Sequence, residues 1–255
     1  MELTERQMNI LAEIRSEARV EVEALAESFS VTTQTIRRDL AQLCDRGLAA
    51  RTHGGAKRLL SVSNVGYEDR RRIQMDVKDQ LGICAASLIP NDCSITLNIG
   101  TTTEQVAHAL GEHSDLVVLS NNVNIITAFI GSKAKELILV GGSVRRSDGA
   151  IVGADAVEFI SRYKVDYAVI GASALDSDGA VLDFDAREVS VARAILKNAR
   201  TKILVCDSTK FEKSAPVRIC QIGDLDYFVT DIQPPESFAN AASLRNTKIL
   251  IANTP

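Results

Sequence analysis

Residues 31–56 read VTTQTIRRDLAQLCDRGLAARTHGGA, and this stretch decides the fold of the first part of the chain. Thr32 is suited to the N-cap of a helix, because its hydroxyl can accept a backbone N–H of the first turn. Along that helix Ile36, Leu40 and Leu43 recur at the spacing of one helical face. The stretch therefore predicts an amphipathic helix with an apolar back against a core and a polar front.

Two shorter helices are expected before this one. Thr4 can cap a helix from about Glu5 to Ser16. A second helix is expected from Val20 to Phe29, where apolar residues recur at i, i+3, i+4 and i+7. Ser30–Val31 then makes the turn into the third helix. Two helices joined by a short turn are typical of a helix-turn-helix.

A short hairpin is expected after the third helix. Gly47 can end that helix as a C-cap glycine. Leu48–Arg51 reads as a strand, and the Gly54–Gly55 pair permits a tight hairpin. Residues 1–57 are therefore expected to form a winged helix-turn-helix domain, with the hairpin as the wing.

Polar and basic side chains gather on the parts of this domain that are expected to be exposed. Residues 37–58 hold six arginines or lysines and two acids, whereas residues 1–30 hold seven acids and three arginines. A basic stripe beside an acidic surface can meet DNA phosphates at one face. Major-groove reading needs donors and small side chains at the start of a helix. The expected DNA-binding residues are Thr32, Thr33, Gln34, Thr35, Arg37 and Arg38 on the helix, and Arg51, His53 and Lys57 on the hairpin.

The composition excludes several other classes of protein. The chain has 255 residues, of which 45% are apolar, which is enough for one or two cores. Its net charge of −4 argues against a protein that coats nucleic acid indiscriminately. No apolar run is long enough to span a bilayer, and the N-terminus does not read as a signal peptide. The five cysteines show no CxxC or Cys/His ligand spacing. We expect a cytoplasmic protein with no metal site and no cofactor.

The pattern changes after the hairpin. Residues 58–73 are expected to form a linker, and residues 74–255 a second domain in which short apolar runs alternate with helical stretches. This alternation predicts an α/β fold with a mainly parallel open sheet and helices on both faces. The expected strands are Ser94–Ile99, Leu116–Ser120, Leu137–Val140, Tyr167–Gly171, Lys202–Asp207 and Tyr227–Thr230, and the expected helices are Thr102–Leu110, Asn122–Ile130, Ala154–Arg162 and Arg187–Asn198.

Polar loops follow several of these strands, at the edge where open α/β sheets bind their ligands. The first loop combines a glycine, three threonine hydroxyls and a helix N-terminus, which together suit a phosphate. It is not a P-loop, because no lysine stands at the required spacing. The same threonines could instead serve only to cap the helix, and Arg145 of a later loop could be a solvated turn residue rather than a phosphate ligand. The candidate ligand-binding residues are Asn98, Gly100, Thr101, Thr102 and Thr103 of the first loop, and Asn121, Arg145, Asp207 and Lys210 of later loops.

Motifs in both parts of the chain resemble the DeoR family of bacterial repressors. The segment TTQTIRRDL…RTHGGA resembles the N-terminal signature of that family, and the similarity continues through NIGTTTEQVAHAL, SNNVN, LVGGSVRRSDGAIVG, DSDGAVLDFD and VCDSTKF. The resemblance implies that residues 74–255 form an effector-binding and oligomerisation domain similar to sugar-phosphate isomerases. It also implies that Gly100 to Thr103 hold a phosphate, and that Lys78, Asp207 and Lys210 affect the response to the effector.

Three positions depart from the family pattern. Asn98 stands where many members have an acid, which bears on how a hydroxyl of the ligand is held. Ala174 stands where a glycine is common, so the loop that contains it is expected to be less open. Thr52 stands where members that control glycerol metabolism often carry a second histidine.

We predict that the chain is a repressor of a carbon-metabolism operon. It would bind double-stranded operator DNA and leave it when a phosphorylated sugar or polyol binds. The resemblance is strongest to family members that control glycerol metabolism, which makes glycerol 3-phosphate the expected effector and a hexose or pentose phosphate the alternative. A homodimer or homotetramer is expected, because paired half-sites need two recognition helices in fixed relation.

A sugar-phosphate isomerase or deaminase is the alternative from another class. Such an enzyme needs a base beside the carbon atoms of the ligand, and Asp183, Asp185 or Glu188 could supply one. These acids are better suited to capping the following helix, and the glycine-rich and paired-acid loops of such enzymes are incomplete here. We therefore predict a protein without catalytic residues.

Overall fold

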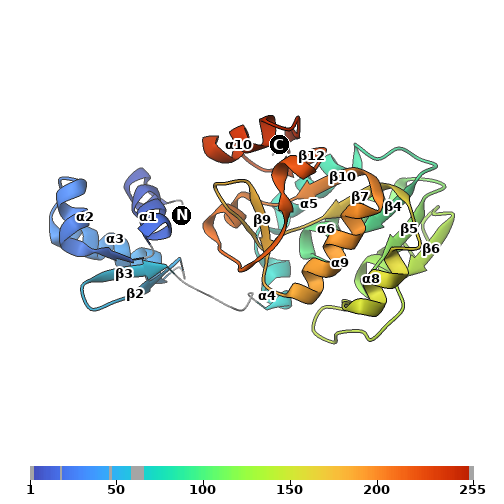
Figure 1. Ribbon diagram of the computed structural model, residues 1–255, viewed down its shortest axis with the longest axis horizontal. Helices are drawn as coiled ribbons and strands as arrows, with labels where there is room; N and C mark the ends of the chain where they lie inside the picture. Colours follow the sequence, from blue (N-terminus) through green and yellow to red (C-terminus); the bar gives the residue numbers. More distant parts are fainter. Residues whose placement is uncertain (1–2, 18, 46–47, 59–65, 253–255) are drawn as a thin grey trace. The chain divides into compact units, whose positions relative to one another are not determined.

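The computed structural model describes residues 3–17, 19–45, 48–58 and 66–252. The chain divides into two compact units, Met1–Ser61 and Val62–Pro255, which are described separately below (Figure 1). Among the described residues, no helix has the length and apolar character needed to cross a membrane.

The first unit is a winged helix-turn-helix, as the sequence predicts. Its helices are α1 (Glu5–Glu17), α2 (Val22–Ser28) and α3 (Thr33–Asp45), and its strands β1 (Arg19–Glu21), β2 (Ala49–Arg51) and β3 (Gly55–Arg58) form an antiparallel sheet in the order β1-β3-β2. The Thr4 hydroxyl accepts the backbone N–H of Gln7 at 3.3 Å, and the Thr32 hydroxyl accepts that of Thr35 at 3.2 Å. Both predicted N-caps are therefore confirmed.

The prediction of one helix from Val20 to Phe29 is wrong at its start. Val20 belongs to the short strand β1 and pairs with Ala56 of β3. The helix α2 begins only at Val22, after Glu21 in an extended conformation. A β-branched residue next to a glycine-rich hairpin favours strand pairing, and helical periodicity alone does not reveal such a distant partner.

Gly55 is required for the pairing of β3 with β1 rather than for the hairpin turn. A Cβ atom at this position would lie 1.9 Å from the backbone oxygen of Val20 on β1. Only glycine allows the two backbones to approach so closely. The sequence had suggested that both glycines serve the hairpin turn. Gly47, the expected C-cap of α3, lies outside the described residues.

The second unit contains a seven-stranded sheet in which every pair of neighbours is parallel. The strand order is β13-β12-β10-β7-β4-β5-β6, made of β4 (Ser94–Leu97), β5 (Val117–Ser120), β6 (Glu136–Leu139), β7 (Val165–Ile170), β10 (Ala199–Val205), β12 (Tyr227–Thr230) and β13 (Lys248–Ile251). A small antiparallel sheet of β8 (Ala174–Leu175), β9 (Ala180–Asp183) and β11 (Val217–Gln221) accompanies it.

Helices cover both faces of the parallel sheet, as predicted. The helices α5 (Met75–Ala86) and α6 (Thr101–Ala109) lie on one face, and α8 (Ala154–Ile160) and α9 (Ala186–Lys197) on the other (Figure 1). The short helix α7 (Val123–Ala128) shares the core of α5 and α6 through Ile125. Alternate strand residues serve two separate cores. Val169 and Ile203 pack with α5 and α6, whereas Ile170 and Leu204 pack with α8, α9 and α10 (Glu236–Ser243). Strands buried on both faces explain why the sequence shows continuous apolar runs here.

The strand order reverses between β4 and β7. From β4 the chain moves outward to β5 and β6, then returns to β7 on the other side of β4 and moves outward to β10, β12 and β13. The loops that leave β4 and β7 therefore turn to opposite faces of the sheet and open a crevice at their carboxyl ends. This point is where open α/β sheets bind ligands.

The segment 58–73, for which the sequence predicts a linker, contains regular structure at both of its ends. Arg58 is the last residue of β3, and residues 59–65 lie outside the described residues. Tyr67–Arg72 form a short helix, α4, which ends two residues before α5 begins. This helix contributes to the cavity described below.

Candidate effector site and DNA-binding face

The start of α3 presents the polar face that the sequence predicts. Ile36, Leu40 and Leu43 are buried, while Gln34 and the two arginines Arg37 and Arg38 are exposed. Neither arginine forms an ion pair with any described residue, so both guanidinium groups can meet an external anion. Thr32 is exposed, and Thr33 and Thr35 are half-buried in the first turn.

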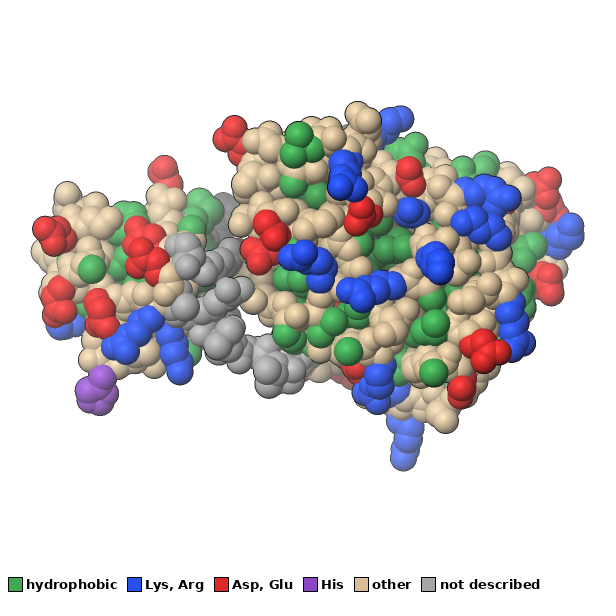
Figure 2. Space-filling model, viewed as in Figure 1, with side chains coloured by type: hydrophobic (Ala, Val, Ile, Leu, Met, Phe, Trp, Pro, Cys, Tyr) green, Lys and Arg blue, Asp and Glu red, His purple; other side chains and the backbone are tan. Residues whose placement is uncertain are grey.

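The hairpin adds the other predicted side chains to the same unit. Arg51 ends β2, Lys57 lies in β3 opposite Ala50, and His53 lies in the turn between the strands. All three are exposed. In Figure 2 lysine and arginine side chains gather along one edge of this unit, beside a projecting histidine. This basic edge agrees with the charge distribution along the sequence.

Asp39 is a residue of this motif that sequence reasoning missed. It is 6% exposed and lies on the buried face of α3. Its carboxylate accepts a hydrogen bond from Arg6 Nε at 2.6 Å and one from Gln7 Nε2 at 3.2 Å. Asp39 therefore ties α1 to the back of α3. An acid among apolar residues on a helix face was the available signal, because a buried charge needs a partner.

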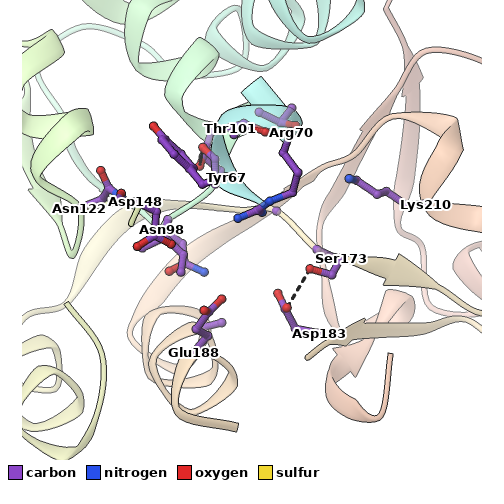
Figure 3. A pocket seen from close by; sticks show the side chains of 17 residues that line it. Tyr67, Arg70, Asn98, Thr101, Asn122, Asp148, Ser173, Asp183, Glu188 and Lys210 are labelled. Carbon is purple, nitrogen blue, oxygen red and sulfur yellow. Dashed lines mark hydrogen bonds between the residues drawn. The ribbon is translucent and has the colours of Figure 1, made fainter. Parts of the chain in front are cut away.

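A polar cavity lies at the switch point of the large sheet. Of the predicted ligand-binding residues, six line it: Asn98, Gly100, Thr101, Thr102, Thr103 and Lys210. Sequence reasoning did not select several others, among them Tyr67, Arg70, Asn122, Asp148 and Ser173, and it considered Asp183 and Glu188 only for the enzyme alternative. Their side chains surround one space in Figure 3. The lining residues come from seven separate stretches of the chain, which is why no local pattern joined them.

The loop after β4 has the geometry of an anion site. Gly100 has φ +144°, which an L side chain rarely adopts, and it precedes the first turn of α6. The Thr103 hydroxyl donates to the carbonyl of Gly100 at 2.8 Å and fixes the turn. The backbone N–H groups at a helix N-terminus point outward and favour a negative charge. This part of the cavity can therefore hold a phosphate.

Lys210 adds a cation to the cavity from the 3-10 helix Ser208–Glu212 that follows β10. Its Nζ lies 3.8 Å from Asp207 Oδ2, and Asp207 also accepts from the backbone N–H and hydroxyl of Thr209. Burial opposes ionisation of Asp207, yet the charge of Lys210 and the bond from Thr209 hold its pKa below the usual range. Asp207 itself does not line the cavity, so it orients Lys210 rather than facing a ligand.

Three other predicted ligand-binding residues are engaged elsewhere. Lys78 donates its Nζ to the carbonyls of Ile73, at 2.7 Å, and Arg70, and burial lowers its pKa to about 8. It therefore caps the end of α4 instead of lining the cavity. Asn121 is fully buried and donates to the carbonyl of Ile151 at 3.1 Å. Neither residue offers its side chain to a ligand in the cavity.

Arg145 is the third of these residues. Its guanidinium binds Asp148 through two hydrogen bonds of 2.8 and 2.6 Å and contacts Glu188 at 2.6 Å and Asp185 at 3.6 Å. The hydrogen bonds that Arg145 donates to Asp148 are the largest cause of its raised pKa. Three carboxylates thus occupy the fork that the sequence assigned to a phosphate.

Acidic side chains form the wall opposite the α6 N-terminus. Asp183 accepts from the Ser173 hydroxyl at 2.8 Å, as the dashed line in Figure 3 marks, and from the backbone N–H of Phe184 at 2.7 Å. Burial raises the pKa of Asp183 and that of Glu188, and the charge of Asp183 adds to the effect at Glu188. Carboxylates in such a position are acceptors for hydroxyl groups. The cavity thus has a basic side and an acidic side.

The departures from the family pattern have clear places. Asn98 is 5% exposed, and its backbone N–H extends the pairing of β4 with β7 through the carbonyl of Val169. Its neutral amide replaces a charge at the cavity wall. Ala174 is fully buried in the antiparallel sheet, where it pairs with Leu182. Its methyl group packs in the small core beside the cavity and does not line it.

Comparison with protein families gives two adjoining matches. Residues 6–62 match the DeoR-like helix-turn-helix domain, and residues 73–232 match the DeoR C terminal sensor domain. The chain belongs to the DeoR family. The two matched regions correspond to the unit with the basic face and the unit with the polar cavity.

Relatives with similar sequences extend over nearly the whole chain. The chain is 40% identical to the glycerol-3-phosphate regulon repressor of Escherichia coli, over 93% of this chain and 94% of that protein. It is 36% identical to the glycerol-3-phosphate regulon repressor of Haemophilus influenzae, over 97% and 96%. It is 33% identical to the transcriptional repressor CsqR of Escherichia coli, over 98% of both chains. These similarities identify the chain as a DNA-binding transcriptional repressor and not an enzyme.

The acidic wall of the cavity is therefore not evidence for isomerase chemistry. The ribose 5-phosphate isomerase A of Methanocaldococcus jannaschii superposes with a TM-score of 0.39 and 15% identity, over 54% of each chain. A TM-score of this size carries no argument about function. Asp185, one of the acids considered for a base, instead caps α9 by accepting the N–H of Arg187.

Proposed function

We propose that the protein represses a carbon-metabolism operon and leaves its operator when glycerol 3-phosphate binds in the cavity of the sensor unit. One observation carries the proposal: the α6 N-terminus and Lys210 face the same cavity as the carboxylates of Asp183 and Glu188. A phosphate monoester suits the first two groups, and free hydroxyls suit the carboxylates. Two relatives are named glycerol-3-phosphate regulon repressors, which supports this ester over other phosphate esters.

The proposed mechanism is thermodynamic linkage. An effector weakens DNA binding only by its different affinity for the DNA-binding and the released states. The exposed face of α3 would enter the major groove, where Gln34 can pair with an adenine edge and Arg38 with guanine or a phosphate. Arg51, His53 and Lys57 of the hairpin would contact the DNA backbone. Thr32, Thr33, Thr35 and Arg37 would complete the contacts at the start of the helix.

We further infer a homodimer or homotetramer in the cytoplasm. Paired half-sites require two recognition helices in a fixed relation, and most homo-oligomers with closed symmetry provide this. Light scattering coupled to size-exclusion chromatography measures the oligomeric state directly. A monomer at the concentrations that bind operator would contradict this inference.

The function can be tested with the purified full-length chain. Sequences that the protein binds are first selected from random DNA, and affinity for the selected duplex is then measured by fluorescence anisotropy. Titration with glycerol 3-phosphate, ribose 5-phosphate, glucose 6-phosphate, inorganic phosphate and glycerol follows. We expect release by glycerol 3-phosphate and none by glycerol. If only another ester releases the DNA, the repressor function is supported and the assignment of glycerol 3-phosphate as the effector is wrong.

Two variants connect the release to the cavity. Thr102→Ala and Lys210→Ala should bind the duplex normally and respond to glycerol 3-phosphate only at higher concentrations. Lys197→Ala is the control, because this exposed lysine lies at the far end of α9. Equal responses in all three variants would place the effector elsewhere. Turnover of a sugar phosphate by the wild-type protein would instead support the isomerase alternative.

A further inference from the structure

The three arginine side chains of Arg70–Arg72 point to different surroundings: one enters the cavity and two face solvent. Arg71 is half exposed, and Arg72 is exposed. Arg70 instead lines the cavity, and Figure 3 shows its side chain reaching from α4 toward the space between Asp183, Glu188 and Thr101. The sequence predicted only a linker here, so Arg70 was not among the predicted site residues.

Arg70 is half-buried, and its guanidinium has no protein partner among the described residues. Its Nε is buried and has no hydrogen-bond partner, and Arg70 forms no ion pair with any described residue. Arg145, whose partners Asp148 and Glu188 line the same cavity, is by contrast saturated by three carboxylates. An unmatched buried donor on a charged group is costly, and an external anion would satisfy it.

Other cations surround the same point. The charge of Arg70 contributes to lowering the pKa of both Lys78 and Lys213, whose values fall to about 8 mainly through burial and through the charge of Lys210. Asp207 is the carboxylate that most opposes these shifts at both lysines. Arg70, Lys78, Lys210 and Lys213 are thus close enough to repel one another, and an anion bound beside Arg70 and Lys210 would relieve this repulsion.

The helix that carries Arg70 is held at its start to α6 and α7 and at its end to α5. Tyr67 donates its hydroxyl to Glu104, in the first turn of α6, at 2.7 Å, and accepts from Asn124 at 2.7 Å. Lys78 caps the other end of α4 through two carbonyls. The position of Arg70 depends on α4 and on the contact of α4 with α6. A ligand that binds the guanidinium is therefore expected to strain the hydrogen bonds of Tyr67 that hold α4 in place.

We propose that Arg70 binds the phosphate of the effector together with the α6 N-terminus, and that α4 transmits occupancy of the cavity to operator release. This proposal rests on the proposed function and adds to it a charged ligand from a second element. A guanidinium pairs with a phosphate through a fork of two N–H donors. Because α4 is the first described helix after the DNA-binding unit, its contacts with α6 are suited to report the bound anion.

The test compares Arg70→Gln, Arg70→Lys and the control Arg72→Gln in the full-length protein. Binding of glycerol 3-phosphate and of inorganic phosphate is measured by calorimetry, and operator affinity by anisotropy. We expect Arg70→Gln to weaken binding of both probes by about tenfold to a hundredfold and to leave operator affinity within threefold. Arg70→Lys should recover part of the loss, and Arg72→Gln should match wild type.

Thermal unfolding separates a ligand role from a structural one. Arg70→Gln should not lower the Tm by more than about 3 °C, because the lost guanidinium donates no hydrogen bond from Nε and forms no ion pair with a described residue. Wild-type affinity in Arg70→Gln overturns the proposal while leaving the proposed function intact. Failure of wild type to bind any of the phosphate esters, by contrast, refutes the proposed function itself.

Tyr67→Phe tests transmission by α4. This variant loses the hydrogen bonds to Glu104 and from Asn124 but keeps the ring and Arg70. At concentrations of glycerol 3-phosphate that saturate the variant, the change in operator affinity should be at least threefold smaller than in wild type. An unchanged release by effector would refute the role of α4, and a matching loss of binding would show that Tyr67 acts on the ligand instead.

Discussion

Replacement of Arg145 by alanine is expected to destabilise the sensor unit rather than to remove a phosphate ligand. The guanidinium holds Asp148 through two short hydrogen bonds and Glu188 through a third contact. The side chains of Asp148 and Glu188 are only 8% and 18% exposed, so each would be left as a poorly solvated carboxylate. Removal of one partner of such a pair costs more than the pair contributes.

The magnitude follows from the number and exposure of these contacts. A hydrogen bond to a charged group contributes about 1.5–3 kcal/mol, and breaking a buried ion pair costs about 3–5 kcal/mol. Arg145 itself is 29% exposed, so solvent screens part of the interaction. We therefore expect a loss of about 2–4 kcal/mol, which corresponds to a Tm lower by about 5–12 °C for a unit of this size.

The dependence of this loss on pH provides an independent check. Burial raises the pKa of Asp148, but Arg145 more than compensates and holds it below the usual range. The stability from Asp148 is therefore present above its unfolded pKa of about 4 and is lost as the pH falls through the lower folded value. Without Arg145, only the N–H of Ala150 and the charge of Arg70 still oppose the effect of burial on Asp148, so the pKa of both carboxylates rises and the variant regains stability relative to wild type as they protonate. The difference in Tm should be larger at pH 7.5 than at pH 5.

Differential scanning calorimetry of wild type, Arg145→Ala and Arg146→Ala measures these differences. Arg146 is exposed and is the matched control, expected to change stability by less than about 0.5 kcal/mol. Equal Tm values for the two variants would refute the role of Arg145 in the carboxylate network. Wild-type stability combined with a large loss of phosphate affinity would restore the original interpretation of Arg145 as a ligand.

Three further predictions concern the DNA-binding face, the wing hairpin and Lys213 near Lys210. Arg38→Ala should weaken operator binding about tenfold without changing effector affinity, as measured by anisotropy, and normal binding at physiological salt would refute the assigned face. Gly55→Ala should abolish operator binding and lower the stability of the DNA-binding unit, because its Cβ would overlap the backbone oxygen of Val20. Hydrogen exchange measures this stability, and Gly111→Ala, where a Cβ meets nothing within 4 Å, is the control. Burial and a neighbouring lysine lower the pKa of Lys213 to about 8, and a bound anion raises it, so effector binding at pH 8 should take up protons; binding heats that are equal in Tris and HEPES would contradict this.

Local periodicity was sufficient for much of the fold. The apolar back of α3 and the N-caps at Thr4 and Thr32 depend on residues within two turns of a helix, so their sequence spacing is enough to predict them. Alternating apolar runs and helices likewise predicted a parallel sheet with two covered faces. Parallel strands end at one edge, which allowed the loop from Asn98 to Thr103 to be selected as a phosphate site.

Partners that lie far apart in the sequence could be found only in the tertiary structure. Nothing near Gly55 in the chain predicts its approach to Val20, and nothing in the GGSVRR motif predicts that Arg145 is taken by Glu188, 43 residues later. In the same way Lys78 and Arg70 exchanged their expected roles: the predicted ligand caps a helix, and the predicted linker residue enters the cavity. Charge and hydrogen-bonding capacity are properties of each residue, but which group satisfies them depends on the packing of the whole unit. The sequence by itself determined that this protein is a DNA-binding repressor and predicted an anion site at a sheet edge. Only the tertiary structure decided that Arg145 is paired with carboxylates while Arg70 enters the cavity without an ion pair to any described residue.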